Sequence, residues 1–194
     1  MGKKYIVAIS GASGAIYGIR LLQELLLRDN ELHILVSDPA ALVINHELGW
    51  DLSDSLEKTI RKHLPDGNMC FYDNNDIAAP LASGSFITDA MVIIPCSMAC
   101  VSGIATGNSR SLMERTADVM LKERRQLILV PRETPLHSIH LRNMLTLSDL
   151  GVHLIPAMPA FYHQPRTVED MIDFIVGKVM DALDINHNVF PRYK

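Results

Sequence analysis

Residues 7–18 read VAISGASGAIYG, an apolar run that gives way to small residues and then resumes with helical spacing. This pattern predicts a buried strand, a tight turn and a helix. The turn matches neither the G-x-G-x-x-G fingerprint of dinucleotide-binding folds nor the Gly-Lys-Ser/Thr ending of a Walker loop. A small-residue turn after a buried strand is typical of the ligand-binding edge of an α/β sheet. The alternative is a turn that only packs the strand closely against the helix and binds no ligand, because it would show the same pattern.

Strand and helix patterns alternate along the whole chain. The expected strands are Lys4–Ile9, Leu32–Val36, Ala90–Ile94, Leu127–Val130 and Val152–Ile155, and the expected helices are Ala15–Leu27, a segment after Pro39, Arg110–Arg124, Ser138–Asp149 and Val168–Leu183. The strand segments are continuously apolar, as strands are when helices cover both faces of a parallel sheet. We therefore expect a three-layer α/β fold of the Rossmann or flavodoxin-like type, with a doubly wound parallel sheet in one domain over residues 1–194.

Composition and charge narrow the classes of partner. The net charge of -4 gives no general attraction to nucleic acid or to an anionic membrane surface. No apolar run approaches the roughly 20 residues of a membrane span, and the first apolar segment is too short for a signal peptide, so we expect a cytoplasmic protein. The three cysteines form no C-x-x-C pair, and we expect Cys96 and Cys100 to pack as small hydrophobic residues.

Three small-residue segments follow the carboxyl ends of predicted strands, where a doubly wound sheet binds its ligand. The first contains Gly11 and Ser13 and leads into a helix whose free N–H groups favour a phosphate. The second begins at Ser37, which can equally cap the helix that follows. The third, PCSMACVSG at 95–103, is a turn of small residues against which a flat ring can lie.

A fourth segment carries most of the charge that could perform chemistry. Arg132 and Glu133 follow a predicted strand, so a guanidinium suited to phosphate lies beside a carboxylate able to move a proton. Upstream, Arg124 and Arg125 read as a solvated helix end. His137 and His140 are one helical turn apart, but no H-E-x-x-H pattern is present and a helix cap is favoured over a metal site. The absence of a G-x-S-x-G motif disfavours a serine hydrolase.

Several segments taken together resemble the UbiX-like flavin prenyltransferases, a family long labelled phenylacrylic or hydroxyarylic acid decarboxylases. They are ISGASGAIYGIRLL at 9–22, ASGSF at 82–86, PCS at 95–97, ERTADVMLKERRQLILVPRETPLHSIHLRNM at 114–144 and PAFYHQP at 159–165. These segments span nearly the whole chain in the expected order. Their combination is highly specific, whereas any one of them would not be.

The resemblance implies a metal-independent transfer of a dimethylallyl group from dimethylallyl phosphate to reduced FMN, followed by closure of a fourth ring on the isoalloxazine. The product, prenylated FMN, would serve a separate UbiD-like decarboxylase that acts in aromatic acid decarboxylation. Enzymes of this family build their sites at subunit junctions and form large assemblies, commonly dodecamers. The resemblance therefore predicts a homo-oligomer.

The resemblance also implies roles for individual residues. FMN contacts fall on Gly11, Ala12, Ser13, Ser37, Ser97, Met98, Ala99, Cys100 and Arg132. Contacts to the prenyl phosphate fall on Lys122, Tyr162, Lys178 and, from another subunit, Arg115. Among these groups Glu133, Ser13 and Lys122 are the predicted catalytic residues, with Glu133 relaying a proton and Ser13 steering the proton at the reactive edge of the flavin.

The chain departs from the family pattern at two places. Relatives often end in an Arg-Trp pair near the rim of the active site, where this chain has Arg192 and Tyr193. The turn at 98–100, with sequence MAC, is less polar than the corresponding turn of many relatives.

Phe161 and Tyr162 offer an aromatic wall that would exclude water from an allyl cation, although ordinary packing explains two adjacent aromatic residues equally well.

Three other functions remain open at this stage. A flavin-dependent cysteine decarboxylase would share a similar sheet, but such enzymes typically carry a P-x-M-N-x-x-M-W segment that this chain lacks. Direct decarboxylation of aromatic acids is the activity that the older family label suggests. A non-catalytic FMN carrier would tolerate Glu133→Gln, whereas a prenyltransferase would lose transfer while still binding flavin.

Overall fold

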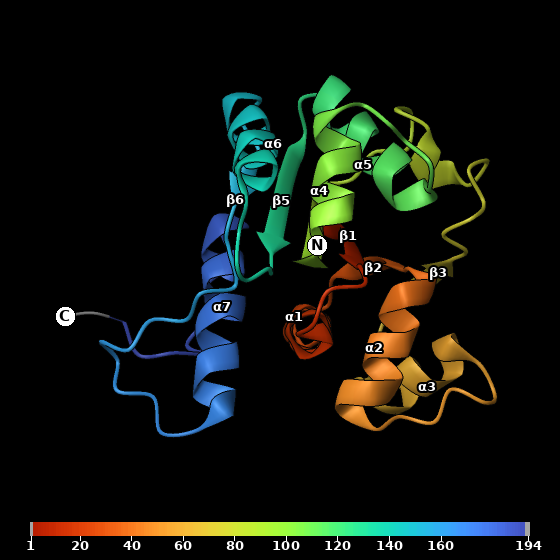
Figure 1. The fold of residues 1–194 in the computed structure, drawn as a ribbon. Helices are drawn as coiled ribbons and strands as arrows, with labels where there is room; N and C mark the ends of the chain where they lie inside the picture. Colours follow the sequence, from red (N-terminus) through yellow and green to blue (C-terminus); the bar gives the residue numbers. More distant parts are fainter. Residues whose placement is uncertain (1, 193–194) are drawn as a thin grey trace.

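The computed structural model describes residues 2–192, which fold around a six-stranded sheet (Figure 1). The strands are β1 (Lys4–Ile9), β2 (Glu31–Val36), β3 (Met69–Tyr72), β4 (Ala90–Cys96), β5 (Gln126–Pro131) and β6 (His153–Leu154). All neighbouring strands pair in parallel, in the order β3-β2-β1-β4-β5-β6. The chain therefore winds outward in both directions from β1 and β4, which confirms the predicted doubly wound α/β fold.

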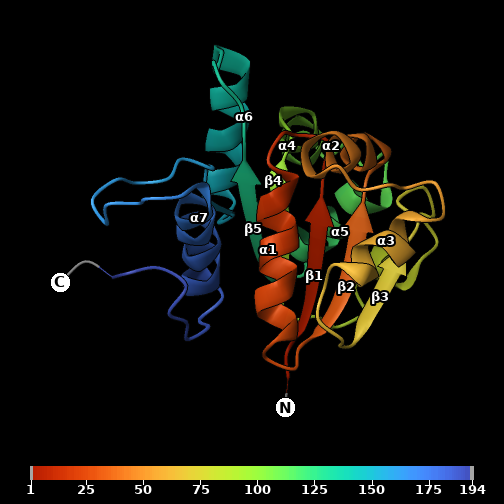
Figure 2. The ribbon, with the colours of Figure 1, turned by 90° about the horizontal axis from the view of Figure 1, so that it is seen from below.

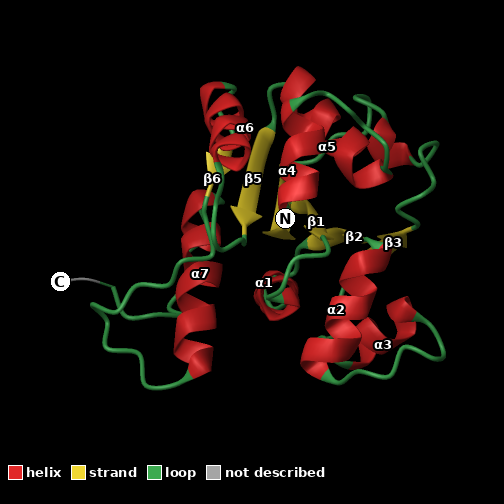
Figure 3. Cartoon of the chain, in the orientation of Figure 1, coloured by secondary structure: helices red, strands yellow, loops and turns green. Residues whose placement is uncertain are grey.

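Helices cover both faces of the sheet (Figure 3). The helices are α1 (Ala15–Leu26), α2 (Asp38–Leu48), α3 (Leu56–Lys62), α4 (Met98–Ala105), α5 (Leu112–Lys122), α6 (Ser138–Asp149) and α7 (Val168–Ala182), with a short 3₁₀ turn, η1 (Pro80–Ala82). Two hydrophobic clusters fill the layers. One packs α1, α2, α3 and α7 on the sheet, and the other packs α4, α5, α6 and η1 on the opposite face.

The predicted strands and helices are all present, and several further elements were not predicted. Helix α3 and edge strand β3 lie between the second and third predicted strands, and the small-residue segment after β4 is helix α4 rather than a turn. Strand β6 is only two residues long, shorter than predicted. On α7, Ile172, Ile175 and Val179 are buried, whereas Val168 at its start is 67% exposed.

Close backbone approach fixes helix α1 on the sheet. A Cβ atom added at Gly18 would lie 2.5 Å from the carbonyl oxygen of Ile94 in β4, so only glycine allows this packing. Figure 2, which views the sheet from below, shows α1 lying along β1 and beside α7. Among the described residues no helix combines the length and apolar character needed to cross a bilayer.

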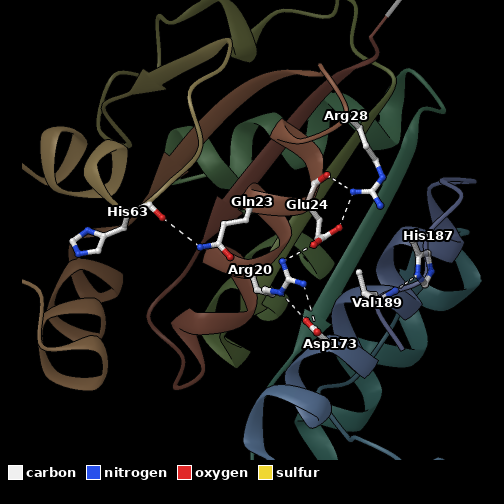
Figure 4. Close-up of polar contacts among 8 residues, drawn as sticks. All are labelled: Arg20, Gln23, Glu24, Arg28, His63, Asp173, His187 and Val189. Carbon is white, nitrogen blue, oxygen red and sulfur yellow. Dashed lines mark hydrogen bonds and ion pairs between the residues drawn. The ribbon is translucent and has the colours of Figure 1, made fainter. Parts of the chain in front are cut away.

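An ion-pair network joins α1 to α7 (Figure 4). Arg20 donates from Nε to Asp173 of α7 at 2.7 Å and pairs with Glu24, whose other oxygen accepts from Arg28 at 2.7 Å. Glu24 is only 6% exposed, and its two arginine partners satisfy its charge. Removing one partner of a buried ion pair strongly destabilises a fold, because it leaves a buried charge without compensation.

Candidate functional site

A pocket of about 290 Å³ opens at the carboxyl edge of the sheet. Its lining comes from the segments that follow β1, β2 and β4 and includes five of the predicted FMN-binding residues: Gly11, Ser37, Ser97, Ala99 and Cys100. This is the edge where the order of the strands reverses, and open α/β sheets bind their ligands there. The structure thus brings together residues that lie as far as 89 positions apart in the sequence.

The side chain of Ser10 fixes the geometry between the segments that follow β1 and β4. Its Oγ donates to the carbonyl oxygen of Pro95 at 2.9 Å and accepts the backbone N–H of Ser97 at 2.7 Å. Ser97 then caps α4, its hydroxyl accepting from the N–H of Cys100 at 3.3 Å. Since Ser10 is only 3% exposed, these contacts stay dry and hold the pocket wall in one position.

The small size of Gly11 brings two further walls together. A Cβ atom at Gly11 would lie 2.4 Å from Cβ of Pro39, at the start of α2. Ser37 ends β2 and caps α2, accepting the N–H of Ala40 at 3.2 Å, so the helix-cap interpretation is correct and Ser37 also lines the pocket. Gly11 is therefore needed for the turn after β1 to reach the turn after β2.

The predicted phosphate site at the start of α1 is wrong in one respect, because the N–H groups there are not free. The carboxylate of Glu47, near the end of α2, accepts the N–H groups of Gly14 at 2.9 Å and Ala15 at 3.2 Å. Gly14 itself occupies the N-cap position with φ 99°, so Ser13 does not cap the helix. Ser13 is exposed at the edge of the sheet, and its side chain is not needed to cap α1.

The segment Ser97–Cys100 is the N-cap and first turn of α4, which changes what its side chains can contact. Met98 and Cys100 are each 6% exposed, and Cys100 Sγ lies 3.8 Å from Sδ of Met113. Met98 can therefore meet a ligand in the pocket only through its backbone. Burial raises the pKa of the neighbouring Cys96 thiol well above its usual value, so this sulfur stays protonated and packs as predicted.

Arg132 links the charged segment after β5 to the turn after β1. Its Nε donates to the carbonyl oxygen of Ser13 at 3.2 Å, across the edge of the sheet. Glu133 follows it on an exposed loop, where its carboxylate accepts the N–H of Thr134 at 3.1 Å. Two of the predicted catalytic residues, Ser13 and Glu133, therefore lie at the same edge of the sheet. His137, farther along this loop, caps α6 as expected.

Asn74, Ser111, Met113 and Glu114 also line the pocket and were missed by the sequence analysis. Asn74 follows β3 and fixes the start of α5: its backbone oxygen accepts the N–H of Leu112 at 2.8 Å and its Oδ1 accepts that of Met113 at 3.0 Å. This wall could have been predicted from Ser111, because serine is a typical N-cap residue. Its hydroxyl caps α5 by accepting the N–H of Glu114. Asn74 has no comparable sequence signal.

One predicted phosphate contact, Lys122, lies away from the pocket in a single chain, and a second, Arg115, is not part of the pocket lining. Lys122 ends α5 at the amino end of β5, and a six-residue strand separates the two edges of the sheet by roughly 20 Å. There its Nζ pairs with Glu123 at 2.9 Å. Arg115, half-buried in α5, pairs with Asp118 at 2.9 Å. Arg125, three residues after Lys122, was expected to be solvated. That prediction is wrong, because Arg125 donates to the carbonyl oxygens of Gly84 and Phe86.

Tyr162 packs against α7, the helix that carries Lys178. The Tyr162 ring meets the edge of Phe174 with centroids 5.9 Å apart, and Lys178 follows Phe174 by one helical turn. Phe161, the other half of the predicted aromatic wall, is 68% exposed. Arg192 also reaches α7, where its Nη2 lies 2.7 Å from Asp181. Tyr193, its partner in the predicted C-terminal pair, lies outside the described residues.

The composition of the pocket suits a ring system with a polyhydroxylated chain. Hydroxyls of Ser37, Ser97 and Ser111 and the amide of Asn74 offer hydrogen bonds, while Gly11 and Ala99 leave room for close approach to the backbone. The volume lies near the lower end of the range for small-molecule sites, about 300–1,000 Å³. FMN fits this donor set, because it combines a flat ring with a ribityl chain.

Comparison with known proteins gives the same picture. Residues 1–185 match a family model described as Flavoprotein. The chain is 51% identical to the flavin prenyltransferase UbiX of Alkalihalophilus pseudofirmus over 189 residues, covering 96% of this chain and 94% of that protein.

Two solved structures are similar along their whole length. One is AnUbiX in complex with FMN and dimethylallyl pyrophosphate, with TM-score 0.90, 41% identity and coverage of 100% of this chain and 98% of that one. The other is a dodecameric FMN-dependent UbiX-like decarboxylase from Escherichia coli, with TM-score 0.87, 42% identity and coverage of 98% and 99%. The peptidyl-cysteine decarboxylase EpiD, at 19% identity and TM-score 0.57, shares the fold alone.

Proposed function

The chain belongs to the UbiX flavin prenyltransferases, and from this membership we propose that it transfers a dimethylallyl group from dimethylallyl phosphate to reduced FMN. The observation that carries the proposal is the convergence of five predicted FMN contacts on one pocket at the carboxyl edge of the sheet. FMN would supply the nucleophilic ring that receives the prenyl group. Gly11, Ser37, Ser97, Ala99 and Cys100 would hold it, with the backbones of Ala12 and Met98 completing the same wall.

The side chains of the protein would assist departure of the phosphate from the prenyl donor. Breaking the carbon–oxygen bond of the donor leaves negative charge on the phosphate, which cations stabilise and an acid protonates. Arg132 and Glu133 support this assignment because they lie at the same edge as the pocket, and Arg132 is held by the Ser13 carbonyl oxygen at 3.2 Å. Ser13, exposed beside them, would steer the proton at the reactive edge of the ring.

Lys122 and Arg115 would reach this site from neighbouring subunits. In one chain Lys122 lies at the opposite edge of the sheet, so a second copy is the simplest source of its ammonium group. Tyr162, on the loop before α7, and Lys178, on α7, would contact the donor. A mixing experiment tests the arrangement: the inactive variants Lys122→Ala and Glu133→Gln should regain activity when co-assembled, since some sites then receive both intact residues. Failure of every mixture would contradict a shared site.

We also propose an assembly, a partner enzyme and a location for this protein. The oligomer would be a dodecamer, as the similar protein from Escherichia coli is. The product would be used by a UbiD-like decarboxylase, and residues 1–194 would act as one domain in the cytoplasm. Size-exclusion chromatography with light scattering tests the assembly. Reconstitution of a UbiD-like apoenzyme with the released flavin tests the partner.

The reaction itself is tested by anaerobic incubation of the protein with reduced FMN and dimethylallyl phosphate. The proposal predicts one inorganic phosphate released for each FMN consumed, with no release when FMN is omitted or oxidised. A matched control is Glu57→Gln, which removes an exposed carboxylate of α3 that pairs with Arg61 and leaves Glu133 in place. Phosphate release that does not depend on reduced FMN would contradict the proposal.

A further inference from the structure

The ammonium group of Lys122 lies against the backbone of Gly84, in the loop between η1 and β4. A Cβ atom added at Gly84 would lie 3.1 Å from Lys122 Nζ and closer still to Oε1 of Glu123. Glu123 in turn pairs with Lys122 at 2.9 Å. The position of the Gly84 backbone therefore limits where the Lys122 ammonium can lie.

The guanidinium of Arg125 holds this loop in place. It donates from Nη1 to the carbonyl oxygen of Phe86 at 2.7 Å and from Nη2 to that of Gly84. A planar guanidinium presents its donors in a rigid fork, so it fixes the two carbonyl groups relative to each other. The Arg125 residue is half-buried, where hydrogen bonds are stronger than in water.

The end of α5 joins Arg125 rigidly to Lys122. Arg124 adopts the left-handed conformation, with φ 54°, and this ends the helix. The N–H of Arg124 donates to the carbonyl oxygen of Leu121 at 3.1 Å, and the N–H of Arg125 donates to that of Met120 at 2.8 Å. This is the Schellman motif, which satisfies the last carbonyl groups of a helix. Lys122 and Arg125 thus belong to one fixed corner of the chain.

The other side of the loop is anchored on the sheet through the ring of Phe86. Nζ of Lys4, in β1, lies 5.0 Å from the centroid of this ring, and the ring of His33, in β2, meets it edge-on at 5.0 Å. His33 is only 2% exposed, so this anchor is part of the packed interior. The loop is therefore held between the sheet and Arg125, with Gly84 facing Lys122.

We propose that Arg125 is a positioning residue that fixes Gly84 against Lys122 and thereby orients the Lys122 ammonium toward the donor phosphate in the site of a neighbouring copy. This inference rests on the function proposed above. Arg125 itself touches neither the donor nor FMN, and its whole effect passes through Lys122.

A double-mutant cycle on donor binding tests the proposal. Dimethylallyl phosphate is titrated into the protein loaded with oxidised FMN, so that no transfer is needed for the measurement. Arg125→Ala should raise the Kd for the donor about tenfold, which corresponds to about 1.4 kcal/mol. In a Lys122→Ala background the same substitution should have no further effect, because two residues that act as a unit are not additive.

Two further variants separate positioning from loss of charge and from misfolding. The matched control is Arg124→Ala, which removes the same charge from the adjacent, exposed position and should leave the Kd unchanged. Phe86→Leu loosens the contacts with Lys4 and His33 while Arg125 stays in place, and it should weaken donor binding as Arg125→Ala does. The Kd for FMN should be the same in every variant, because the FMN pocket lies at the other edge of the sheet.

Equal donor binding by the wild-type and Arg125→Ala proteins overturns the inference. Additive losses in the double variant also overturn it, because they indicate that Arg125 acts on the fold in general and not through Lys122. A wild-type protein that binds the donor and transfers nothing contradicts the proposed function alone, and the cycle then still decides the role of Arg125. A wild-type protein that binds no donor contradicts both.

Discussion

Replacing Ser10 with alanine tests how the pocket is built. The substitution removes the hydroxyl that accepts the Ser97 N–H at 2.7 Å and donates to the Pro95 carbonyl oxygen at 2.9 Å. The Pro95 oxygen keeps a second partner, the Ser10 N–H at 3.2 Å, so the main loss is an unpaired N–H at Ser97. A buried donor left without a partner costs about 1–3 kcal/mol, and we expect a loss of about 2 kcal/mol.

The expected consequence is measurable in stability and in ligand binding. For a chain of this size, 2 kcal/mol lowers Tm by about 4–8 °C. The affinity for FMN should fall with it, because Ser97 caps α4 and lines the pocket. Thermal unfolding without flavin, followed by fluorescence titration with FMN, measures both. The matched control is Ser148→Ala, at an exposed serine of α6, with an expected change within about 0.5 kcal/mol.

The reasoning would be refuted if Ser10→Ala changed Tm no more than Ser148→Ala does. A lower Tm with unchanged FMN affinity would refute only the link between this hydrogen bond and the pocket. Either result is informative without a structure of the variant.

Three further changes have defined outcomes. Gly18→Ala should cost about 1–3 kcal/mol in a urea titration, because the added Cβ lies 2.5 Å from the backbone oxygen of Ile94, which cannot move alone. Glu47→Ala should cost about 1 kcal/mol in thermal unfolding, since it uncovers two N–H groups of α1. Burial holds the pKa of His33 below its ordinary 6.5, although Glu31 opposes the shift. The unfolded chain therefore binds more protons below that pH, so stability should fall on acidification through 6.5, and His33→Gln should flatten the dependence of the urea midpoint on pH.

The sequence was informative where burial is continuous. Strand β4 is buried at every residue and β1 at all but the first, so their apolar runs marked them clearly. The pattern of the turn after β1 also predicted a ligand-binding position, because small residues at a strand end leave room for a ligand. By contrast, β3 is a short edge strand with one buried residue, and its pattern could not be distinguished from a loop.

Long-range contacts explain most of what the sequence could not predict. Glu47 covers the start of α1 from 33 positions away, and Asn74 fixes α5 from 39 positions away. Neither contact leaves a local pattern. Helix α4 was taken for a turn because its residues are small, although the serine that precedes it is a typical N-cap. The family resemblance supplied candidate residues such as Lys122, but no sequence pattern showed that it lies at the opposite edge of the sheet.

The mass of the flavin released after anaerobic incubation with reduced FMN and dimethylallyl phosphate tests the central claim most directly. The wild-type protein should convert FMN to a species heavier by one dimethylallyl group. Glu133→Gln should bind FMN with unchanged affinity and release it with its mass unchanged. Unmodified flavin from the wild-type protein, or full conversion by Glu133→Gln, would contradict the account.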